Sequence, residues 1–258
     1  MRIIGIIPVR MSASRFPGKP LAMMNGIPML GHVYHRSKMS KILDEVYIAA
    51  CDDEIFQYAK EIGAKVVSTK NTHERASDRT AEAMIKIEQE INKTIDIVAM
   101  IQGDEPMLVP EMIDMAVEPL INDTEILVSN LMGLLQNREE HEDPNEIKVV
   151  VDNDSYALYF SREPIPSCRS VADDAPIYKQ VCIIPFKRDF LTKFNQLSQT
   201  PLEKAESIDM LRVLEHGYKV KMVFTEDETY SVDTVSDLKK VEGLMEKDTL
   251  ISQYSNIQ

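Results

Sequence analysis

Ile3-Ile4-Gly5-Ile6-Ile7 is a short apolar run, and it leads into the loop Arg10-Met11-Ser12-Ala13-Ser14-Arg15-Phe16-Pro17-Gly18-Lys19-Pro20. An apolar run of this length that ends at Pro8 predicts a buried strand. The loop then lies at the carboxyl end of that strand, which is where open α/β sheets bind their ligands. The stretch therefore predicts an α/β fold whose first loop binds a ligand.

The composition of this loop favours a polyphosphate as the ligand. Arg10, Arg15 and Lys19 supply positive charge, and backbone amides and serine hydroxyls can donate hydrogen bonds to phosphate oxygens. The loop does not match a Walker sequence, which needs Gly at position Ala13 and Ser or Thr at position Pro20. Taken alone, the loop is also compatible with a solvated basic turn.

The composition of the chain narrows its class. With 258 residues, 44% of them hydrophobic and 28% charged, it can build one sizeable α/β domain with an elaboration, or two small domains. The formal net charge of −13 argues against a nucleic-acid partner, because a general phosphate-backbone binder needs a basic face.

The sequence also indicates a cellular setting. Cys51, Cys168 and Cys182 are odd in number and widely spaced, which favours buried thiols over disulfides. The sequence shows no signal peptide and no apolar run long enough to span a bilayer. We therefore expect a cytoplasmic protein with no membrane insertion.

Apolar runs alternate with helical patterns, as in a mostly parallel sheet. In the first half, further strands are expected at 46–50, 65–68, 95–101 and 126–130, and helices at 28–37, 53–62, 77–91 and 111–120. In the second half, strands are expected at 181–186 and 218–225, and helices at 188–195, 201–215 and 235–245. The predicted fold class is α/β, a mostly parallel nucleotide-binding sheet with helices on both faces and an inserted antiparallel hairpin.

The inserted hairpin is expected from two apolar runs, 147–152 and 157–160, on either side of a turn at 153–155. A hairpin that projects from a parallel sheet needs a partner to bury its apolar side chains. The predicted organisation is one domain over 1–258. It has an α/β core at 1–142 and 175–248, the projecting hairpin at 143–174, and a flexible tail at 249–258.

Two acidic sequences supply chemistry that the basic loop lacks. Asp104 follows the predicted strand 95–101, and Asp233 precedes the predicted helix 235–245. Mg²⁺ binds one or two carboxylates together with phosphate oxygens and water, so these two residues fit a Mg²⁺ site beside a polyphosphate. In isolation, Asp104 is also compatible with a plain acidic turn, and Asp233-Thr234 with a helix N-cap.

Six blocks of sequence follow one another in a characteristic order. They are Arg10-x-x-x-Ser14-Arg15-Phe16-Pro17-Gly18-Lys19-Pro20-Leu21, Ser77-Asp78-Arg79-x-Ala81-Glu82, Gln102-Gly103-Asp104-Glu105-Pro106, Asp143-Pro144-Asn145, Leu158-Tyr159-Phe160-Ser161-Arg162-x-Pro164-Ile165-Pro166 and Val232-Asp233-Thr234. In this order they resemble the bacterial 3-deoxy-D-manno-octulosonate (Kdo) cytidylyltransferases, also called CMP-Kdo synthetases. The resemblance covers nearly the whole chain.

The resemblance implies a cytoplasmic, Mg²⁺-dependent homodimer that couples CTP to an acidic eight-carbon sugar and releases pyrophosphate for lipopolysaccharide biosynthesis. The inserted hairpin would help to form the dimer contact. The resemblance also implies roles for individual residues. Arg10 and Lys19 would bind the triphosphate, with Ser14 and Arg15 in the same loop, and Arg79 and Gln102 would bind the nucleotide. Asp104 and Asp233 would bind Mg²⁺, and Arg162 would lie on the sugar side. In-line attack of a sugar hydroxyl on the α-phosphorus needs positioning and charge neutralisation rather than a covalent intermediate.

The departures from the family pattern fall mainly on the sugar side. Gln180 and Ile184 stand where the family shows a histidine and a tyrosine, and Asp209-Met210 stand where it shows Glu-Gln. Because a site built to hydrogen-bond hydroxyls rejects ligands that leave its polar groups unpaired, these changes favour a different acidic sugar. An ordinary Kdo enzyme with compensating changes is the other interpretation.

Two further function classes stay open at this point. One is a nucleotidyltransferase for another nonulosonic or related acidic sugar, which would share the phosphate and Mg²⁺ residues but not the sugar pocket. The other is a non-catalytic nucleotide-binding relative. Retention of Arg10, Lys19, Asp104 and Asp233 counts against the second, because a mere binder needs no pair of metal carboxylates.

Overall fold

Parallel strands form the centre of the part of the chain that contains both termini. The computed structural model describes residues 1–12, 16–167 and 176–255. Its contacts group the chain into a terminal unit, Met1–Asp114 with Thr229–Gln258, and a middle unit, Met115–Glu228. These boundaries differ from the predicted division into a core at 1–142 and 175–248 and a hairpin at 143–174.

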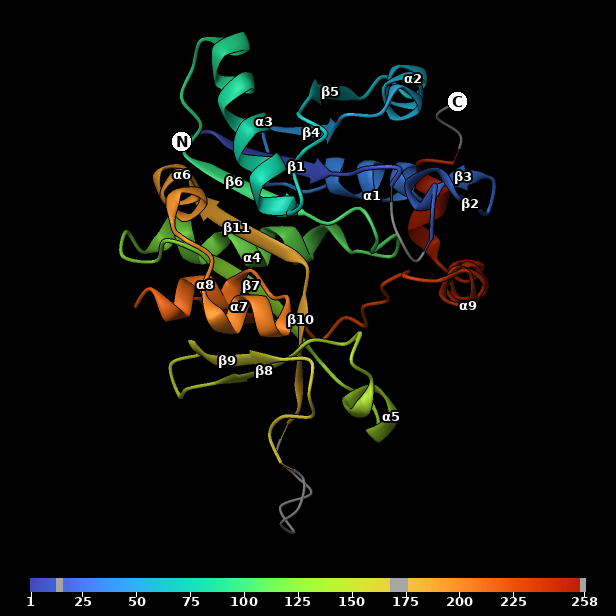
Figure 1. Ribbon diagram of the computed structural model, residues 1–258. Helices are drawn as coiled ribbons and strands as arrows, with labels where there is room; N and C mark the ends of the chain where they lie inside the picture. The colour runs from blue at the N-terminus through green and yellow to red at the C-terminus, as the bar shows by residue number, and fades with distance from the viewer. Residues whose placement is uncertain (13–15, 168–175, 256–258) are drawn as a thin grey trace. The chain divides into compact units, whose positions relative to one another are not determined.

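The terminal unit is built on β1 (Ile3–Pro8), which pairs in parallel with β4 (Glu45–Ala50) and β6 (Ile97–Ile101). β5 (Lys65–Ser68) adds to β4, so the strand order there is β6-β1-β4-β5 (Figure 1). All residues of β1 and β6 are buried. Parallel strands are covered on both faces, which is why they appear in the sequence as continuous apolar runs.

Three helices connect these strands: α1 (Met29–Lys38), α2 (Asp53–Glu61) and α3 (Ala76–Ile91). Each matches its predicted range within one residue. The helix α3 packs against β1, β4, β5 and β6 and ends at Asn92, which adopts a left-handed conformation. The short strands β2 (Met23–Met24) and β3 (Ile27–Pro28) pair around Asn25-Gly26, where both residues have positive φ, as a tight hairpin turn requires.

The C-terminal segment of the terminal unit is packed, not free. The helix α9 (Val235–Met245) begins with a capping box between Thr234 and Asp237 and is followed by the 3₁₀ helix η2 (Thr249–Gln253). Tyr254 is 1% exposed. The predicted flexible tail at 249–258 is therefore wrong for residues 249–254, because the aromatic ring and hydroxyl of Tyr254 have buried partners far away in the sequence.

The middle unit contains a second sheet with the order β12-β7-β10-β8-β9. Its strands are β7 (Ser129–Leu134), β8 (Lys148–Val151), β9 (Ala157–Ser161), β10 (Tyr178–Val181) and β12 (Lys221–Phe224). The strands β8 and β9 form the predicted antiparallel hairpin, but β8 also pairs with β10. The hairpin is therefore part of a five-stranded sheet and not an isolated ribbon.

Several boundaries in the middle unit differ from the predicted ones. The expected strand 181–186 is divided at Cys182 into β10 and β11 (Ile183–Lys187). The expected helix 201–215 is two helices, α7 (Pro201–Glu206) and α8 (Met210–Glu215), because Ser207 adopts a left-handed conformation with φ 57°. The other helices are α4 (Pro110–Asn122), which starts in the terminal unit, α5 (Arg138–Glu142) and α6 (Arg188–Gln196).

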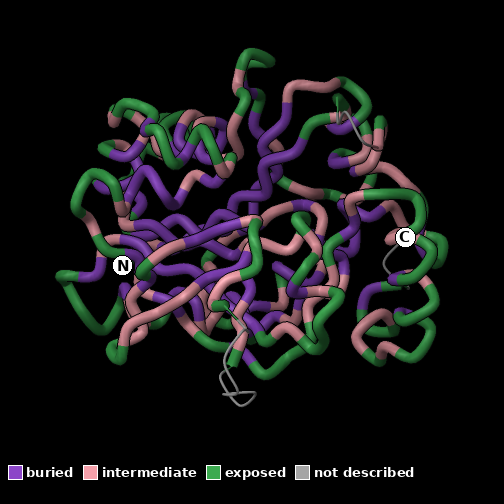
Figure 2. The backbone as a smooth tube through the Cα atoms, turned by 60° about the horizontal axis from the view of Figure 1, so that its bottom comes forward, coloured by how far each residue is buried: buried purple, intermediate pink, exposed green. Residues whose placement is uncertain are grey.

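Burial follows the elements of both units (Figure 2), with exposed residues gathered at turns and at the ends of helices. Among the described residues, every helix is too short or too polar to cross a membrane.

Candidate active site

The loop after β1 carries Lys19 into a pocket of the terminal unit. Gly18 has φ 77°, a left-handed conformation that a side chain would strain, and its amide donates to the Met11 carbonyl at 3.0 Å. The chain then turns directly into the 3₁₀ helix η1 (Lys19–Leu21). Asp52, two residues after β4 and at the N-cap of α2, accepts a hydrogen bond from the Met11 amide at 3.1 Å and fixes the start of the loop.

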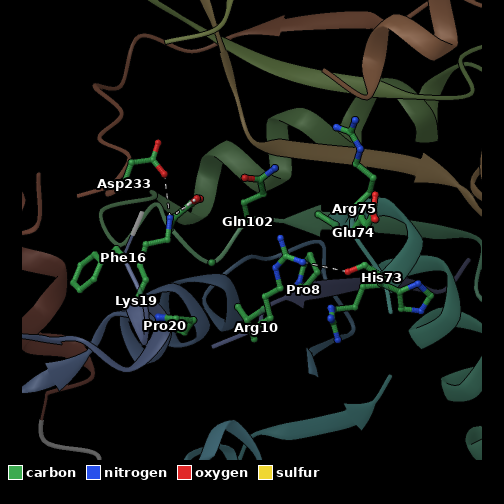
Figure 3. A pocket seen from close by; sticks show the side chains of 15 residues that line it. Pro8, Arg10, Phe16, Lys19, Pro20, His73, Glu74, Arg75, Gln102 and Asp233 are labelled. Carbon is green, nitrogen blue, oxygen red and sulfur yellow. Dashed lines mark hydrogen bonds and ion pairs between the residues drawn. The ribbon is translucent and has the colours of Figure 1, made fainter. Parts of the chain in front are cut away.

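The ammonium group of Lys19 lies between two carboxylates. Its Nζ is 3.1 Å from Asp104 Oδ2 and 3.2 Å from Asp233 Oδ1, and it donates to the Val232 carbonyl at 2.8 Å. Figure 3 shows Lys19 pointing towards Asp233. Burial by itself would lower the pKa of Lys19, but the charges of Asp104 and Asp233 outweigh it and raise this pKa above its usual value. Lys19 is therefore cationic and holds the two carboxylates together.

Asp104 and Asp233 reach Lys19 from different segments. Asp104 follows β6 after Gly103, where an added Cβ would lie 2.5 Å from Val9 Cγ1, so only glycine lets the chain pass this close. The Val232 amide donates to the Asp104 carbonyl at 2.9 Å and joins the two segments. Thr234, not Asp233, is the N-cap residue of α9, so the Asp233 carboxylate is directed to Lys19.

Cationic side chains line the part of the pocket that lies away from the two carboxylates. Arg10 Nη1 donates to the His73 carbonyl at 3.4 Å, and Arg75 is the N-cap residue of α3 (Figure 3). Arg79 is 3% exposed, and its Nη1 donates to Thr69. Its buried Nη2 has no hydrogen-bond partner among the described residues. A buried guanidinium donor beside a helix N-terminus favours an anionic or strongly accepting ligand.

These two parts belong to one cavity of about 330 Å³. Gln102 lines this cavity together with Lys19 and Arg10 (Figure 3). The lining residues are Pro8, Val9, Arg10, Phe16, Lys19, Pro20, His73, Glu74, Arg75, Ala76, Arg79, Gln102, Gly103, Asp104 and Asp233.

The carboxylates of this cavity suit a hard divalent cation that shares its coordination with a ligand. Asp104 and Asp233 face one another across Lys19 and keep 23% and 21% of their side-chain surface exposed. Across the described residues, no three His, Cys, Asp or Glu side chains gather into a metal cage. Two carboxylates, completed by phosphate oxygens and water, match the coordination typical of Mg²⁺.

Comparison with known proteins agrees with this geometry. The cytidylyltransferase family matches residues 4–222. The 3-deoxy-manno-octulosonate cytidylyltransferase of Geobacter metallireducens is 40% identical over 251 residues, which cover 93% of this chain and 96% of that protein. The chain belongs to the 3-deoxy-manno-octulosonate cytidylyltransferase family.

Relatives in this family extend beyond bacteria. The Arabidopsis thaliana protein named 3-deoxy-manno-octulosonate cytidylyltransferase, mitochondrial, is 39% identical over 246 residues, 95% of this chain and 83% of that protein. A solved structure of a CMP:2-keto-3-deoxy-manno-octonic acid synthetase complexed with CTP covers 96% of this chain and 100% of that chain, with a TM-score of 0.88 and 35% identity. These findings confirm the family resemblance and the α/β fold class.

The structure brings six of the predicted residues of this family member into one cavity: Arg10, Lys19, Arg79, Gln102, Asp104 and Asp233. Ser14 and Arg15 lie outside the described residues. Asp52 was not predicted as a part of the site. Asp52 follows the strand neighbouring β1, and that position at a strand end was the signal that could have indicated it.

The predicted sugar-side residues all belong to the middle unit. The Arg162 guanidinium donates to the carbonyls of Glu206 and Pro144, each at 2.8 Å. Gln180 Nε2 donates to Asn130 Oδ1 at 2.5 Å. Ile184 is 3% exposed and Met210 is fully buried, whereas Asp209 is the N-cap residue of α8.

Proposed function

We propose that this protein transfers the cytidylyl group of CTP to the anomeric hydroxyl of a 2-keto-3-deoxy sugar acid, either Kdo or a close variant. The products would be the CMP-sugar and pyrophosphate. The observation that carries the proposal is the pair of carboxylates on Lys19 in a cavity that also holds Arg10 and Arg79. Family membership supports the same reaction.

The residues of the cavity can position a triphosphate for in-line attack. The acceptor hydroxyl loses its proton to water while its oxygen forms a bond to the α-phosphorus. The bond from the α-phosphorus to the bridging oxygen breaks, and pyrophosphate leaves with that electron pair. Arg10 and Lys19 would offset the charge of the leaving group, and Arg79 and Gln102 would bind the nucleoside part. Positioning and charge neutralisation can supply most of the acceleration without a covalent intermediate.

Asp104 and Asp233 would hold Mg²⁺ when the nucleotide binds. The chemistry that Mg²⁺ supplies when bound is neutralisation of phosphate charge and a lower pKa for an attacking hydroxyl. Lys19 would then be released from the two carboxylates to donate to a phosphate oxygen.

We expect Asp104→Asn and Asp233→Asn each to abolish turnover while the fold is kept. Each change removes a ligand charge, but the Val232–Asp104 backbone hydrogen bond that joins the two segments does not depend on either side chain. Pyrophosphate release over a range of Mg²⁺ concentrations measures the effect, and circular dichroism checks the fold. The control is Asp189→Asn, because that carboxylate is 92% exposed on α6. Wild-type turnover of a folded Asp233→Asn enzyme at low Mg²⁺ would contradict the metal assignment.

We also propose that the acceptor differs from unmodified Kdo. Gln180 supports this, because Asn130 fixes its amide: Asn130 Nδ2 donates to the Val181 carbonyl at 2.7 Å, so Asn130 Oδ1 faces Gln180 Nε2. A neutral amide held in this way offers different hydrogen bonds from the histidine of the family pattern. Ile184 and Met210 offer no polar groups and almost no surface, so we place the discrimination on Gln180, Asp209 and Arg162.

Gln180→His should raise kcat/KM on Kdo and lower it on the native acceptor. The expected change is about tenfold, since one hydrogen bond to a sugar hydroxyl is worth about 1 to 3 kcal/mol. The affinity for CTP should not change. The measurement is kcat/KM on Kdo, amino-substituted analogues and nine-carbon acids, with the exposed Gln57→His on α2 as control. The idea of an altered acceptor is wrong if Kdo is the best wild-type substrate by tenfold or more.

The oligomeric state is a further proposal, a homodimer formed through the hairpin β8–β9. Leu158 on β9, the terminal strand of the second sheet, is 61% exposed. An exposed leucine on a terminal strand of a sheet is an aggregation hazard unless a partner covers it.

We expect light scattering to report a dimer at micromolar concentration, and Leu158→Asp to shift it to monomer by placing a charge in the contact. Ile85→Asp on α3, which is 41% exposed in the terminal unit, is the matched control and should stay dimeric. A monomeric wild-type protein would rule out this assembly.

A further inference from the structure

A buried arginine of α1 connects the two segments that carry Asp104 and Asp233. Arg36 is 1% exposed. Its Nη1 donates to the Leu108 carbonyl at 3.3 Å, its Nε donates to the Tyr254 hydroxyl at 3.0 Å, and its Nη2 pairs with Asp248. One side chain thus joins α1, the loop 102–109 and the C-terminal segment (residues 229–255). All of these contacts lie within the terminal unit.

The Tyr254 hydroxyl completes this arrangement through His32. His32 Nε2 donates to the Met24 carbonyl at 2.8 Å, so Nδ1 of the neutral ring accepts from the Tyr254 hydroxyl at 2.9 Å. Burial lowers the pKa of His32 and so favours this neutral ring. The Tyr254 oxygen is then left to accept from Arg36 Nε. Every hydrogen bond of the set has a consistent donor and acceptor.

The connection to Asp104 runs through the loop after β6. Leu108 is the last residue but one before α4, and its amide donates to the Glu105 carbonyl at 3.1 Å. The Arg36 bond therefore fixes the far end of a short turn whose near end carries Asp104. Met107, in the same turn, packs against the apolar cluster that includes Val232.

The connection to Asp233 runs through α9. Val241 and Met245 on α9 pack in one cluster with Val232, Met24 and Met29. Asp248 follows α9 and caps η2, since its Oδ1 accepts from the Leu250 amide at 2.9 Å. Through Asp248, Arg36 therefore holds the end of α9 that is distant from Asp233, and the apolar cluster packs from Val232, next to Asp233, along α9 to Met245.

The chemistry of the Arg36–Asp248 ion pair indicates that it fixes the positions of the segments and adds little to the stability of the fold. Burying an arginine and a carboxylate costs desolvation that their attraction only partly returns, so such a pair adds little net stability compared with apolar residues. What it does fix is the position of three segments at once. All of the C-terminal segment lies beyond residues 4–222, which the cytidylyltransferase family matches.

We propose that Arg36, with Tyr254 and Asp248, is a set of positioning residues that fixes the spacing of the Asp104 and Asp233 carboxylates for their cation. The identity of the cation rests on the proposed function. The positioning of the two carboxylates does not rest on it. None of the three residues lines the cavity or touches Lys19. They would act only through the segments that they hold.

Tyr254→Phe tests this most cleanly, because it keeps the ring stacked on His35 at 5.5 Å and removes only the hydroxyl. Tyr58→Phe is the matched control: it also removes one buried hydroxyl in the terminal unit, but that hydroxyl has no hydrogen-bond partner among the described residues. Arg36→Lys is the stronger variant, since one ammonium group cannot serve Leu108, Tyr254 and Asp248 together.

Two readouts are measured on the full chain. Hydrogen exchange should become faster for residues 229–234 and 103–108 in Tyr254→Phe, with β4 and β5 unchanged and no change in the control. The Mg²⁺ concentration for half-maximal pyrophosphate release should rise three- to tenfold, while kcat at saturating Mg²⁺ stays within twofold. Excess Mg²⁺ should therefore restore activity, which a general loss of stability would not allow.

The outcomes separate the two proposals. Unchanged exchange at 229–234, or a lower melting temperature with unchanged Mg²⁺ dependence, would overturn the positioning role. If the wild-type protein releases no pyrophosphate from CTP with any acceptor, the proposed function fails, and hydrogen exchange alone then decides the positioning. If Arg36→Lys does not fold, Tyr254→Phe still gives both readouts.

Discussion

The ammonium group of Lys19, shared by the carboxylates of Asp104 and Asp233, is the interaction on which the rest of the site depends. Two carboxylates that face one small volume repel each other. The interaction energy of two unit charges about 4 Å apart is roughly 4 kcal/mol near a protein surface. The two attractions to Lys19 therefore outweigh the one repulsion between the carboxylates. The same arrangement keeps the two acids ready for a cation that can replace the lysine.

The shared contact with Lys19 requires three segments that are far apart in the sequence to meet at one end of a parallel sheet. Lys19 follows β1, Asp104 follows β6, and Asp233 precedes α9. The first two positions are adjacent because β1 and β6 are neighbouring parallel strands. Asp233 has no strand to place it, so its position depends on the Val232–Asp104 hydrogen bond, the apolar cluster under α9 and the contacts of Arg36.

The sequence predicted well what depends on local pattern. The strands β1, β4 and β5 and the helices α1, α2, α3 and α9 appear at or near their expected ranges, because buried parallel strands are continuous apolar runs and caps mark the helix ends. The short hairpin at Asn25-Gly26 and the break at Ser207 were missed, since each depends on one or two residues with positive φ.

What could not be predicted depends on contacts between distant residues. Tyr254 is hydrogen-bonded to Arg36 across 218 positions, and nothing in the sequence of residues 249–255 indicates that partner. The predicted site residues Arg10, Lys19, Asp104 and Asp233 lie in one cavity because their motifs lie at the ends of elements. Asp52 carries no such motif, and only the fold reveals its hydrogen bond to the Met11 amide.

The most direct test of the account is a crystal structure with a non-hydrolysable CTP analogue and Mn²⁺, whose anomalous scattering locates the metal. The account predicts a Mn²⁺ peak between the carboxylates of Asp104 and Asp233, with phosphate oxygens completing its coordination. It also predicts that Lys19 Nζ has moved from at least one carboxylate to a phosphate oxygen. A metal bound elsewhere, with Lys19 still bridging both acids, would contradict it.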